Sequence, residues 1–291
     1  MFNILQWNCR GLRANQEELK VLVRNSRANI ICLQETLLGD REFNFGLDYS
    51  VYRSLGQPVG QASGGTAVIV HRSLQHSVVD LDTDLQATAV TFTSNSRVTV
   101  CSLYLEPHLE QRRPPLSLAD LQHLVNQLPA PFIILGDFNA KNPMWGSTCR
   151  DRWGQIVEDL VDANSISLLN DGSFTRFDIH HGTHSAIDVT LCSSSIYLDY
   201  TWSRDMDLHG SDHYPIFIKH VQSTPSESFP KWKLEEADWV KFRELLETLD
   251  LDPSLGLHIE AYDHLVDSLL DAANMCIPKT KGKPKRPTVS W

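Results

Sequence analysis

The chain has 291 residues, 42% of them hydrophobic and 21% charged, which is an ordinary composition for a globular protein with a large core. Its 36 acidic and 26 basic residues give a formal net charge of −10, which argues mildly against tight non-specific binding to DNA. No apolar run is long enough to cross a membrane, and the N-terminus enters a strand-like segment at once, so we expect neither a membrane span nor a signal peptide. The six cysteines lack CxxC spacing, which predicts reduced core residues of an intracellular protein.

Short apolar runs predict strands, and apolar residues spaced three and four apart predict helices. The strands are expected, in chain order, up to Asn8 and over residues 30–33, 64–70, 87–93, 98–104, 132–135, 186–189 and 214–217. Three helices are expected in this part of the chain: one that begins after Asn15, one over residues 117–128 and one over residues 152–163. Asn15 would cap the first of them.

The last quarter of the chain has a different pattern. A Ser- and Pro-rich stretch is followed by two amphipathic helices and a basic tail that contains prolines. We therefore expect a domain over residues 1–221, a linker over residues 222–230, and a helical segment with a basic tail over residues 231–291.

Polar side chains stand where the predicted strands end. They are Asn8, Glu35, Asp137 with Asn139, Asp188, and the pair Asp212-His213. Strand ends lie along one rim of a sheet, where sites in α/β folds are common. Carboxylates, carboxamides and one imidazole on a single rim suit a hard cation and a phosphate group.

Each of these residues has a chemical interpretation and a plainer one. Glu35 offers Mg²⁺ a rigid carboxylate, or it is an ordinary loop glutamate. Strand alternation would place Asp137 and Asn139 on one face, where one could accept a proton from water and the other could hold a phosphate oxygen. The plainer interpretation is that the two residues form a turn. Protonated His213 would stabilise a phosphorane, with Asp188 to orient it, or it is a structural histidine.

The order of the motifs is more specific than any one of them. Asn, Gln-Glu, Tyr-x-x-Pro, Gly-Asp-x-Asn, Ile-Asp and Ser-Asp-His follow one another over about residues 1–220, which resembles the endonuclease/exonuclease/phosphatase superfamily. The finer resemblance is to the endonuclease domain of non-LTR (LINE-type) retrotransposons of the Jockey or I-like groups. It rests on Trp7–Leu12, Asp137–Ser147, Leu169–Gly172, Ser185–Asp188 and His209–His213. The stretch from Lys231 to the C-terminus resembles the segment that precedes reverse transcriptase in those polyproteins.

This resemblance implies an α/β sandwich of two packed mixed β-sheets flanked by helices, the four-layer DNase I-like fold. It implies a Mg²⁺-dependent endonuclease, with Mn²⁺ as a substitute, that nicks one strand of double-stranded DNA to give a 3′-hydroxyl for target-primed reverse transcription. The reverse transcriptase domain of the same polyprotein would be its partner. It would act in the nucleus, and the isolated domain would be monomeric.

The resemblance also implies roles for individual residues. The metal ligands would be Glu35 and Asn8, with help from Asp212. The catalytic residues would be Asp137, Asn139, His213, Asp188 and Tyr104, the last contacting the scissile phosphate. The DNA contacts would be Arg10, Thr175, Arg176, Phe177 and Ser211. Abasic-site enzymes carry an acid at the position of Arg10 and an aromatic residue at that of Thr175, so both positions favour cleavage of intact DNA.

Residues 176–184 correspond to a hairpin loop that related endonucleases use to probe DNA beside the scissile bond. In that case they would recognise the shape of the DNA groove. The alternative is a solvated turn that makes no contact with DNA. His180, His181 and His184 cluster there without the spacing of a zinc site.

Three rival functions stay open. A phosphatase of the same superfamily would use the same site but needs a basic pocket, and no Lys/Arg cluster accompanies the motifs. An abasic-site endonuclease is the second rival. A domain with a decayed site that only binds partners is the third, and the intact set of motif residues speaks against it.

Overall fold

Two six-stranded β-sheets form the centre of the first part of the chain. The first sheet contains, in spatial order, β13 (Tyr200–Arg204), β14 (Ile216–His220), β1 (Asn3–Asn8), β2 (Ile30–Gln34), β4 (Thr66–His71) and β3 (Tyr49–Ser54). The second contains β5 (Gln75–Val79), β6 (Gln86–Thr93), β7 (Arg97–Tyr104), β8 (Phe132–Asp137), β12 (Asp188–Ser193) and β9 (Ile166–Leu168). The helices are α1 (Gln16–Ser26), α2 (Leu118–Gln127) and α3 (Arg152–Ala163), with short 3-10 turns at Pro143–Trp145 and Ser194–Asp199.

The structure, a computed structural model, describes residues 2–54, 64–94, 96–107, 116–221, 232–247 and 259–279, without the side chains of residues 259–267. Contacts divide the chain into two units, Met1–Gln222 and Ser223–Trp291. The expected linker over residues 222–230 and the basic tail beyond residue 279 lie outside the described residues. The expected domain boundaries therefore stay a prediction.

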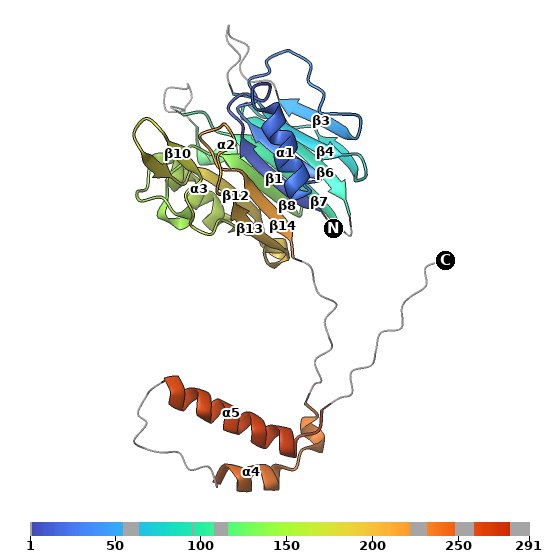
Figure 1. Ribbon diagram of the computed structural model, residues 1–291, viewed down its shortest axis with the longest axis vertical. Helices are drawn as coiled ribbons and strands as arrows, with labels where there is room; N and C mark the ends of the chain where they lie inside the picture. The colour runs from blue at the N-terminus through green and yellow to red at the C-terminus, as the bar shows by residue number, and fades with distance from the viewer. Residues whose placement is uncertain are drawn as a thin grey trace, which may run out of the picture. The chain divides into compact units, whose positions relative to one another are not determined.

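Helices cover the outer faces of both sheets in the first unit, as the ribbon diagram shows (Figure 1). The first helix, α1, packs on the first sheet through Leu19 and Leu22. The helices α2 and α3 pack on the second sheet through Leu124 and Leu160. A third apolar core fills the space between the sheets. The unit thus has four layers, and the predicted fold class is confirmed.

The helices begin for local reasons that the sequence reveals only in part. Ser117 and Asp120 form a reciprocal capping box at α2, and the Asp151 side chain accepts the Gly154 N–H at α3. The predicted cap at Asn15 is wrong, because its side chain makes no capping hydrogen bond. Its Nδ2 instead donates to the carbonyl oxygens of Cys9 and Gly210 and so connects two loops.

The cysteine prediction holds for most positions. All six cysteines are free, and five of them are buried. Cys149 is exposed, contrary to the expectation, because it lies in the irregular segment between Trp145 and α3 rather than in a strand.

Strand pairing brings distant polar residues to one end of both sheets. The strands β1 and β2 run parallel, so Asn8 is paired with Gln34, the residue before Glu35. In the second sheet, Asp137 is paired with Tyr104 on one side and with Asp188 on the other. The end of each sheet therefore presents several of the predicted site residues.

The described residues of the second unit include two helices, as predicted. They are α4 (Trp239–Glu247) and α5 (Ile259–Cys276), preceded by a 3-10 turn at Leu234–Glu236. Trp239, Val240, Leu270 and Met275 are exposed apolar side chains on these helices. Over the residues that the structure describes, no helix has the length and apolarity needed to span a membrane.

Candidate active site

A buried Asp–His–Asp group forms the centre of the candidate site. The Nδ1 atom of His213 lies 2.8 Å from Asp188 Oδ2, and its Nε2 atom lies 3.7 Å from Asp137 Oδ2. The three side chains come from β8, β12 and the loop before β14, and all are almost fully buried. Such a group can hold an imidazole in one orientation between two carboxylates.

The surroundings of this group shift two pKa values. Burial opposes protonation of His213, but the charges of Asp188 and Asp137 raise the pKa of its ring to about 9. Burial raises the pKa of Asp137 to about 7, with a further rise from the charge of Asp188 and an opposing effect of His213. His213 is therefore a cationic hydrogen-bond donor at neutral pH, while Asp137 can accept a proton there.

Asn8 connects the first sheet with the second. Its Nδ2 atom donates to Glu35 Oε1 at 3.0 Å and to Asp137 Oδ2 at 2.9 Å. The hydroxyl of Tyr104 donates to the same Glu35 oxygen at 3.1 Å. Burial and the charge of Glu35 raise the pKa of Tyr104 well above its usual range, so this phenol stays a donor. Four predicted residues from four segments thus lie in one hydrogen-bonded set.

Asn139 reaches the site by a turn rather than by strand alternation, so the reason given for its position is wrong. The strand β8 ends at Asp137, and Asn139 has a left-handed backbone with φ of 46°. Its backbone N–H donates to Asp137 Oδ1 at 3.0 Å, and its Nδ2 donates to Leu105 O at 2.9 Å. The turn nevertheless places Asn139 beside Asp137, with Nδ2 at 3.3 Å from Asp137 Oδ2.

The backbone is strained at several points around this set. Arg10, Glu35 and Asn139 have φ values of 44°, 47° and 46°, in the left-handed region that side chains rarely adopt. Gly136 has φ of 155°, and a Cβ atom there would lie 1.9 Å from the carbonyl oxygen of Leu103. A glycine is therefore required for β8 to pass this close to β7 just before Asp137.

The loop that carries His213 is anchored to β1. Trp7 Nε1 donates to the carbonyl oxygen of His213 at 3.0 Å. The hydroxyl of Ser211 donates to Asn8 O at 2.7 Å and accepts the N–H of His213 at 3.2 Å. Ser211, predicted to contact DNA, therefore uses its hydroxyl to hold the loop.

Asp212, predicted to assist the metal ligands, is paired with arginine instead. Its Oδ2 accepts from Nε of Arg176 at 2.9 Å and lies 2.8 Å from Nη2 of the same residue. Arg10 Nη1 lies 3.9 Å from Asp212 Oδ1, with the Arg10 side chain 58% exposed. Burial raises the pKa of Asp212, but the charges of His213 and Arg176 outweigh it and lower that pKa. Arg176 is thus committed to a carboxylate, whereas Arg10 is open to an anionic substrate.

Thr175, which was predicted to contact DNA, has a structural role in the fold. Its side chain is fully buried. Its Oγ1 atom accepts the backbone N–H groups of Ile187 and Asp188 at 3.1 and 3.0 Å. Thr175 therefore fixes the backbone at the start of β12, and hence the position of Asp188.

Residues 176–184 form a hairpin that is attached to the site. Its strands are β10 (Arg176–Asp178) and β11 (Thr183–Ser185), and the N–H of Phe177 donates to Asp212 O at 2.8 Å. Phe177 packs on His184 with ring centroids 4.7 Å apart, so it is half-buried rather than projecting. Ile179, at the hairpin tip, is 71% exposed.

Gln6 is a residue of the candidate site that the sequence motifs did not predict. Its Nε2 atom donates to Asp188 Oδ1 at 2.9 Å, so both oxygens of Asp188 are bonded, one to Gln6 and one to His213. Gln6 is completely buried, and its Oε1 atom has no hydrogen-bond partner among the described residues. The signal was available, because strand alternation places Gln6 on the same face of β1 as Asn8.

The donor set fits a hard divalent cation. Asp137, Asp188 and His213 bring potential ligand atoms within 4.8 Å of one another, but the two Asp188 oxygens are already used. The carboxylate of Glu35 faces that of Asp137 across the single amide of Asn8. Two carboxylates beside a carboxamide favour a cation with oxygen ligands such as Mg²⁺ or Mn²⁺.

Comparisons with known proteins show what the chain is similar to. Residues 98–217 match the family described as "Endonuclease-reverse transcriptase". The chain is 25% identical to the probable RNA-directed DNA polymerase from transposon BS of Drosophila melanogaster, over 93% of this chain and 30% of that protein. It is 26% identical to the polymerase from mobile element jockey of Drosophila funebris, over 91% of this chain and 29% of that protein. The chain therefore spans about 30% of the length of these relatives.

Solved structures give the same result for the fold. The endonuclease domain of TRAS1, a telomere-specific non-LTR retrotransposon, is 25% identical with a TM-score of 0.63, over 75% of this chain and 97% of that domain. A 3′-5′ exonuclease from Neisseria meningitidis is 19% identical with a TM-score of 0.59, over 75% of this chain and 99% of that one. The first unit thus has the DNase I-like fold of hydrolytic nucleases, and the predicted resemblance of the chain to the endonuclease part of non-LTR retrotransposon polyproteins is confirmed.

Proposed function

We propose that this chain is a Mg²⁺-dependent DNA endonuclease, with Mn²⁺ as a substitute, which nicks one strand of double-stranded DNA and leaves a 3′-hydroxyl. The nick would prime reverse transcription by the reverse transcriptase domain of the same polyprotein, in the nucleus. The similarity to RNA-directed DNA polymerases of mobile elements and to the TRAS1 endonuclease domain supports this proposal.

One observation carries the proposal. A proton acceptor, Asp137, and a cationic donor, His213, face each other at 3.7 Å, while Asn8 connects the same Asp137 to Glu35. Hydrolysis of a phosphodiester needs a base for water, a donor for the charge that develops on phosphorus oxygens, and a cation for the remaining charge. These residues supply the first two and a set of ligands for the third.

Asp137 accepts the proton of the attacking water in this mechanism. The amides of Asn8 and Asn139 donate to its carboxylate, so the carboxylate has a fixed orientation. A base whose pKa lies near the working pH is efficient, and burial brings the pKa of Asp137 to about 7.

His213 stabilises the negative charge of the transition state with its Nε2–H, because Nδ1 is already held by Asp188. Gln6 donates to the carboxylate of Asp188, and the Thr175 hydroxyl accepts the backbone N–H of Asp188, so the position of Asp188 is fixed in turn. Tyr104 donates its hydroxyl to Glu35 and can donate to a phosphate oxygen placed beside that residue. Bound at Glu35 and Asn8, Mg²⁺ would supply Lewis-acid stabilisation of the phosphate charge.

A plasmid assay tests the proposal. The full chain should convert supercoiled plasmid to the nicked circle in Mg²⁺ or Mn²⁺ and not in EDTA. His213→Ala should abolish nicking, whereas His123→Ala, a change at an exposed histidine of α2, should not. Absence of metal-dependent nicking by the wild-type chain would contradict the proposal.

The rival activities give different results in parallel assays. A phosphatase of this superfamily would release inorganic phosphate from phosphoinositides or nucleotides and leave plasmid intact. An abasic-site endonuclease would cleave only a duplex that carries an abasic residue. Equal rates on intact duplex and on abasic duplex support the proposed activity on intact DNA.

A further inference from the structure

A hollow lies at the opposite end of the first sheet from the candidate active site. Its volume is about 470 Å³, within the range of small-molecule sites. It is lined by residue Asn29, which immediately precedes β2, whereas Glu35 immediately follows that strand. A five-residue strand spans roughly 16 Å, so the two sites are separate. We refer to this hollow as the α1 pocket.

One wall of the α1 pocket is basic. Lys20, Arg24 and Arg27 line it at spacings of four and three residues, which places them on one face of α1 and its C-terminus. Lys20 pairs with the exposed Glu17 at 2.7 Å. Within the described part of the chain, no carboxylate forms an ion pair with Arg24 or Arg27. The dipole of α1 favours a cation in its last turn, which explains Arg24 but not Lys20, five residues into the helix.

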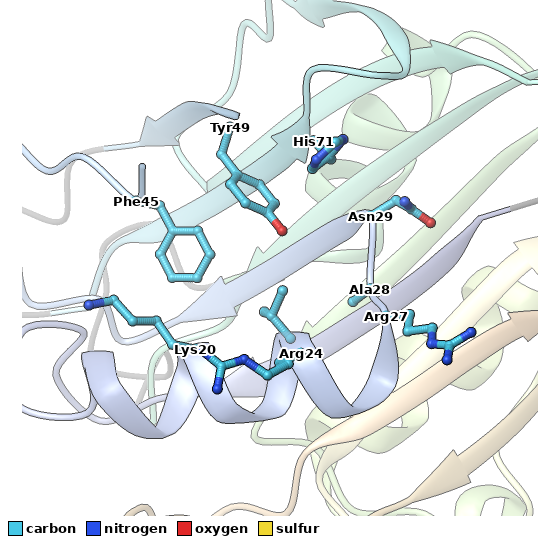
Figure 2. A pocket seen from close by; sticks show the side chains of 9 residues that line it. Lys20, Arg24, Arg27, Ala28, Asn29, Phe45, Tyr49 and His71 are labelled. Carbon is cyan, nitrogen blue, oxygen red and sulfur yellow. The ribbon is translucent and has the colours of Figure 1, made fainter. Parts of the chain in front are cut away.

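The other wall is aromatic. Tyr49 lies between Phe45 and His71, with ring centroids 5.0 Å from each in edge-to-face contact. Phe45 is buried, and Tyr49 and His71 are partly exposed. Figure 2 shows the Tyr49 hydroxyl pointing toward α1, with Lys20 and Arg24 along the facing helix. A planar group that enters from solvent therefore meets Tyr49 on one side and cationic side chains on the other.

We infer that the α1 pocket binds an unpaired nucleotide of a single-stranded nucleic acid, with its base against Tyr49 and its phosphates against Arg24 and Arg27. Proteins bind single strands by combining aromatic side chains, on which bases stack, with cations along the backbone. A base inside a duplex is stacked between its neighbours and cannot enter a concave site. The chain as a whole carries a net charge of −10, which disfavours non-specific binding, and the cationic wall of the α1 pocket is a local exception to that charge.

The inference is independent of nicking, because the pocket shares no residue with the candidate active site. Under the proposed function, a nuclease fused to a reverse transcriptase domain would meet single strands at both the nicked DNA and the RNA template. The pocket chemistry accepts either, since both present unpaired bases and phosphates.

The experiment measures binding of fluorescently labelled octanucleotides to the full chain in EDTA, where no cleavage occurs. Oligo-dT and oligo-U are compared with a duplex of the same length, by anisotropy over a series of salt concentrations. The wild-type chain should bind at least one single strand more tightly than the duplex. Arg24→Glu with Arg27→Glu should weaken that binding by at least tenfold and reduce the slope of log K against log salt by about 1.4, or ~0.7 for each lost phosphate contact.

Two further variants separate the pocket from its alternatives. Tyr49→Leu should weaken binding by roughly tenfold through loss of stacking, while Tyr49→Phe should restore it. Arg97→Glu with Lys219→Glu makes the same change of charge at exposed positions outside the pocket and should have little effect. All substituted arginines and lysines are exposed, so circular dichroism should confirm folding. Equal losses in the two charge-reversal variants, equal losses on duplex and single strand, or no binding by the wild-type chain would overturn the inference.

Discussion

The two ends of the first sheet have opposite chemical character. Where β1 and β2 end, polar side chains such as Asn8 and Gln6 are buried and bonded to specific partners. Where β2 begins, the charged groups are exposed and basic, as at Arg24 and Arg27. Buried side chains with defined hydrogen bonds have fixed positions, which catalysis of a reaction requires. Exposed cations attract phosphate groups without fixing their position. The difference is the one that our two proposals require, with a reaction site at one end of the sheet and a binding site at the other.

The largest expected effect comes from the buried end. His213→Ala and Asp137→Asn should each lower the nicking rate by about 10²–10⁴-fold, because each removes a group that acts in the transition state. Folding should survive, and Asp137→Asn should be neutral or stabilising, since burial disfavours the Asp137 charge. Asp171→Asn, a change at an exposed aspartate, serves as the control. If either variant kept more than about a tenth of the wild-type activity, the residue changed in it would not have the proposed catalytic role.

Gln6→Leu tests how much the hydrogen bonds that orient His213 through Asp188 contribute to the nicking rate. The change keeps the size of the side chain but removes the donor to Asp188 Oδ1. We expect kcat to fall by roughly tenfold to a hundredfold, as for other groups that orient an active-site residue, with KM for DNA little changed. The matched control is Gln155→Leu, at a partly exposed position of α3 outside the candidate site. An unchanged kcat would limit Gln6 to a packing role.

Glu35→Gln tests the metal site. It preserves shape and removes one negative charge, so the Mg²⁺ concentration required for half-maximal nicking should rise by about tenfold, and Mn²⁺ should restore part of the activity because it binds such ligands more tightly. The measurement is the nicking rate of Glu35→Gln and of the wild type over a series of Mg²⁺ and Mn²⁺ concentrations. The same substitution at the exposed Glu17 is the control. Identical metal titrations for Glu35→Gln and wild type would assign the cation to other ligands.

Replacement of residues 176–184 with a short Gly-Ser turn tests how the hairpin contributes. We predict that nicking persists while the distribution of nick sites along a plasmid becomes flatter, because the exposed hairpin tip would no longer contact the DNA groove. Sequencing of the nick positions decides this. Arg176 is paired with Asp212, so a second variant should keep Arg176 and replace only residues 178–183. An unaltered site profile in both variants would exclude the hairpin from target choice.

The smallest effect concerns stability in EDTA. The pKa of His213 is raised in the folded state to about 9 from a usual value of 6.5, so its protonation stabilises the fold fully below pH 6.5. That contribution is lost as the pH rises through 9. The free energy of unfolding, measured in urea, should therefore fall over this range in the wild-type chain and be flatter in His213→Gln. Parallel curves for the two proteins would contradict a raised pKa.

The local parts of the fold could be predicted from sequence because they depend on near neighbours. The helix predicted over residues 152–163 is observed as Arg152–Ala163, with its apolar face inward. The order of the motifs also predicted the residues that meet at the sheet ends. Their proximity follows from strand register, which places Asp137 between Tyr104 and Asp188.

Contacts between distant segments were harder to predict. Gln6 and Asp188 are 182 positions apart, and no pattern within β1 shows that its Gln would bind that carboxylate. Thr175 was named as a DNA contact from the family resemblance alone, but tertiary packing buries its side chain against the start of β12. Asp212 looks like a metal ligand in sequence, and only the fold brings Arg176 to it. Such side-chain partners depend on how the loops pack.

One measurement tests the central claim most directly. Plasmid nicked by the chain in Mg²⁺ is incubated with a DNA polymerase and labelled nucleotides, with Asp137→Asn and Asp171→Asn in parallel. We expect nicks that the polymerase extends without any prior phosphatase treatment, formed by the wild type and Asp171→Asn but not by Asp137→Asn or in EDTA. Nicks that require phosphatase before extension, or equal nicking by Asp137→Asn, would contradict the central claim.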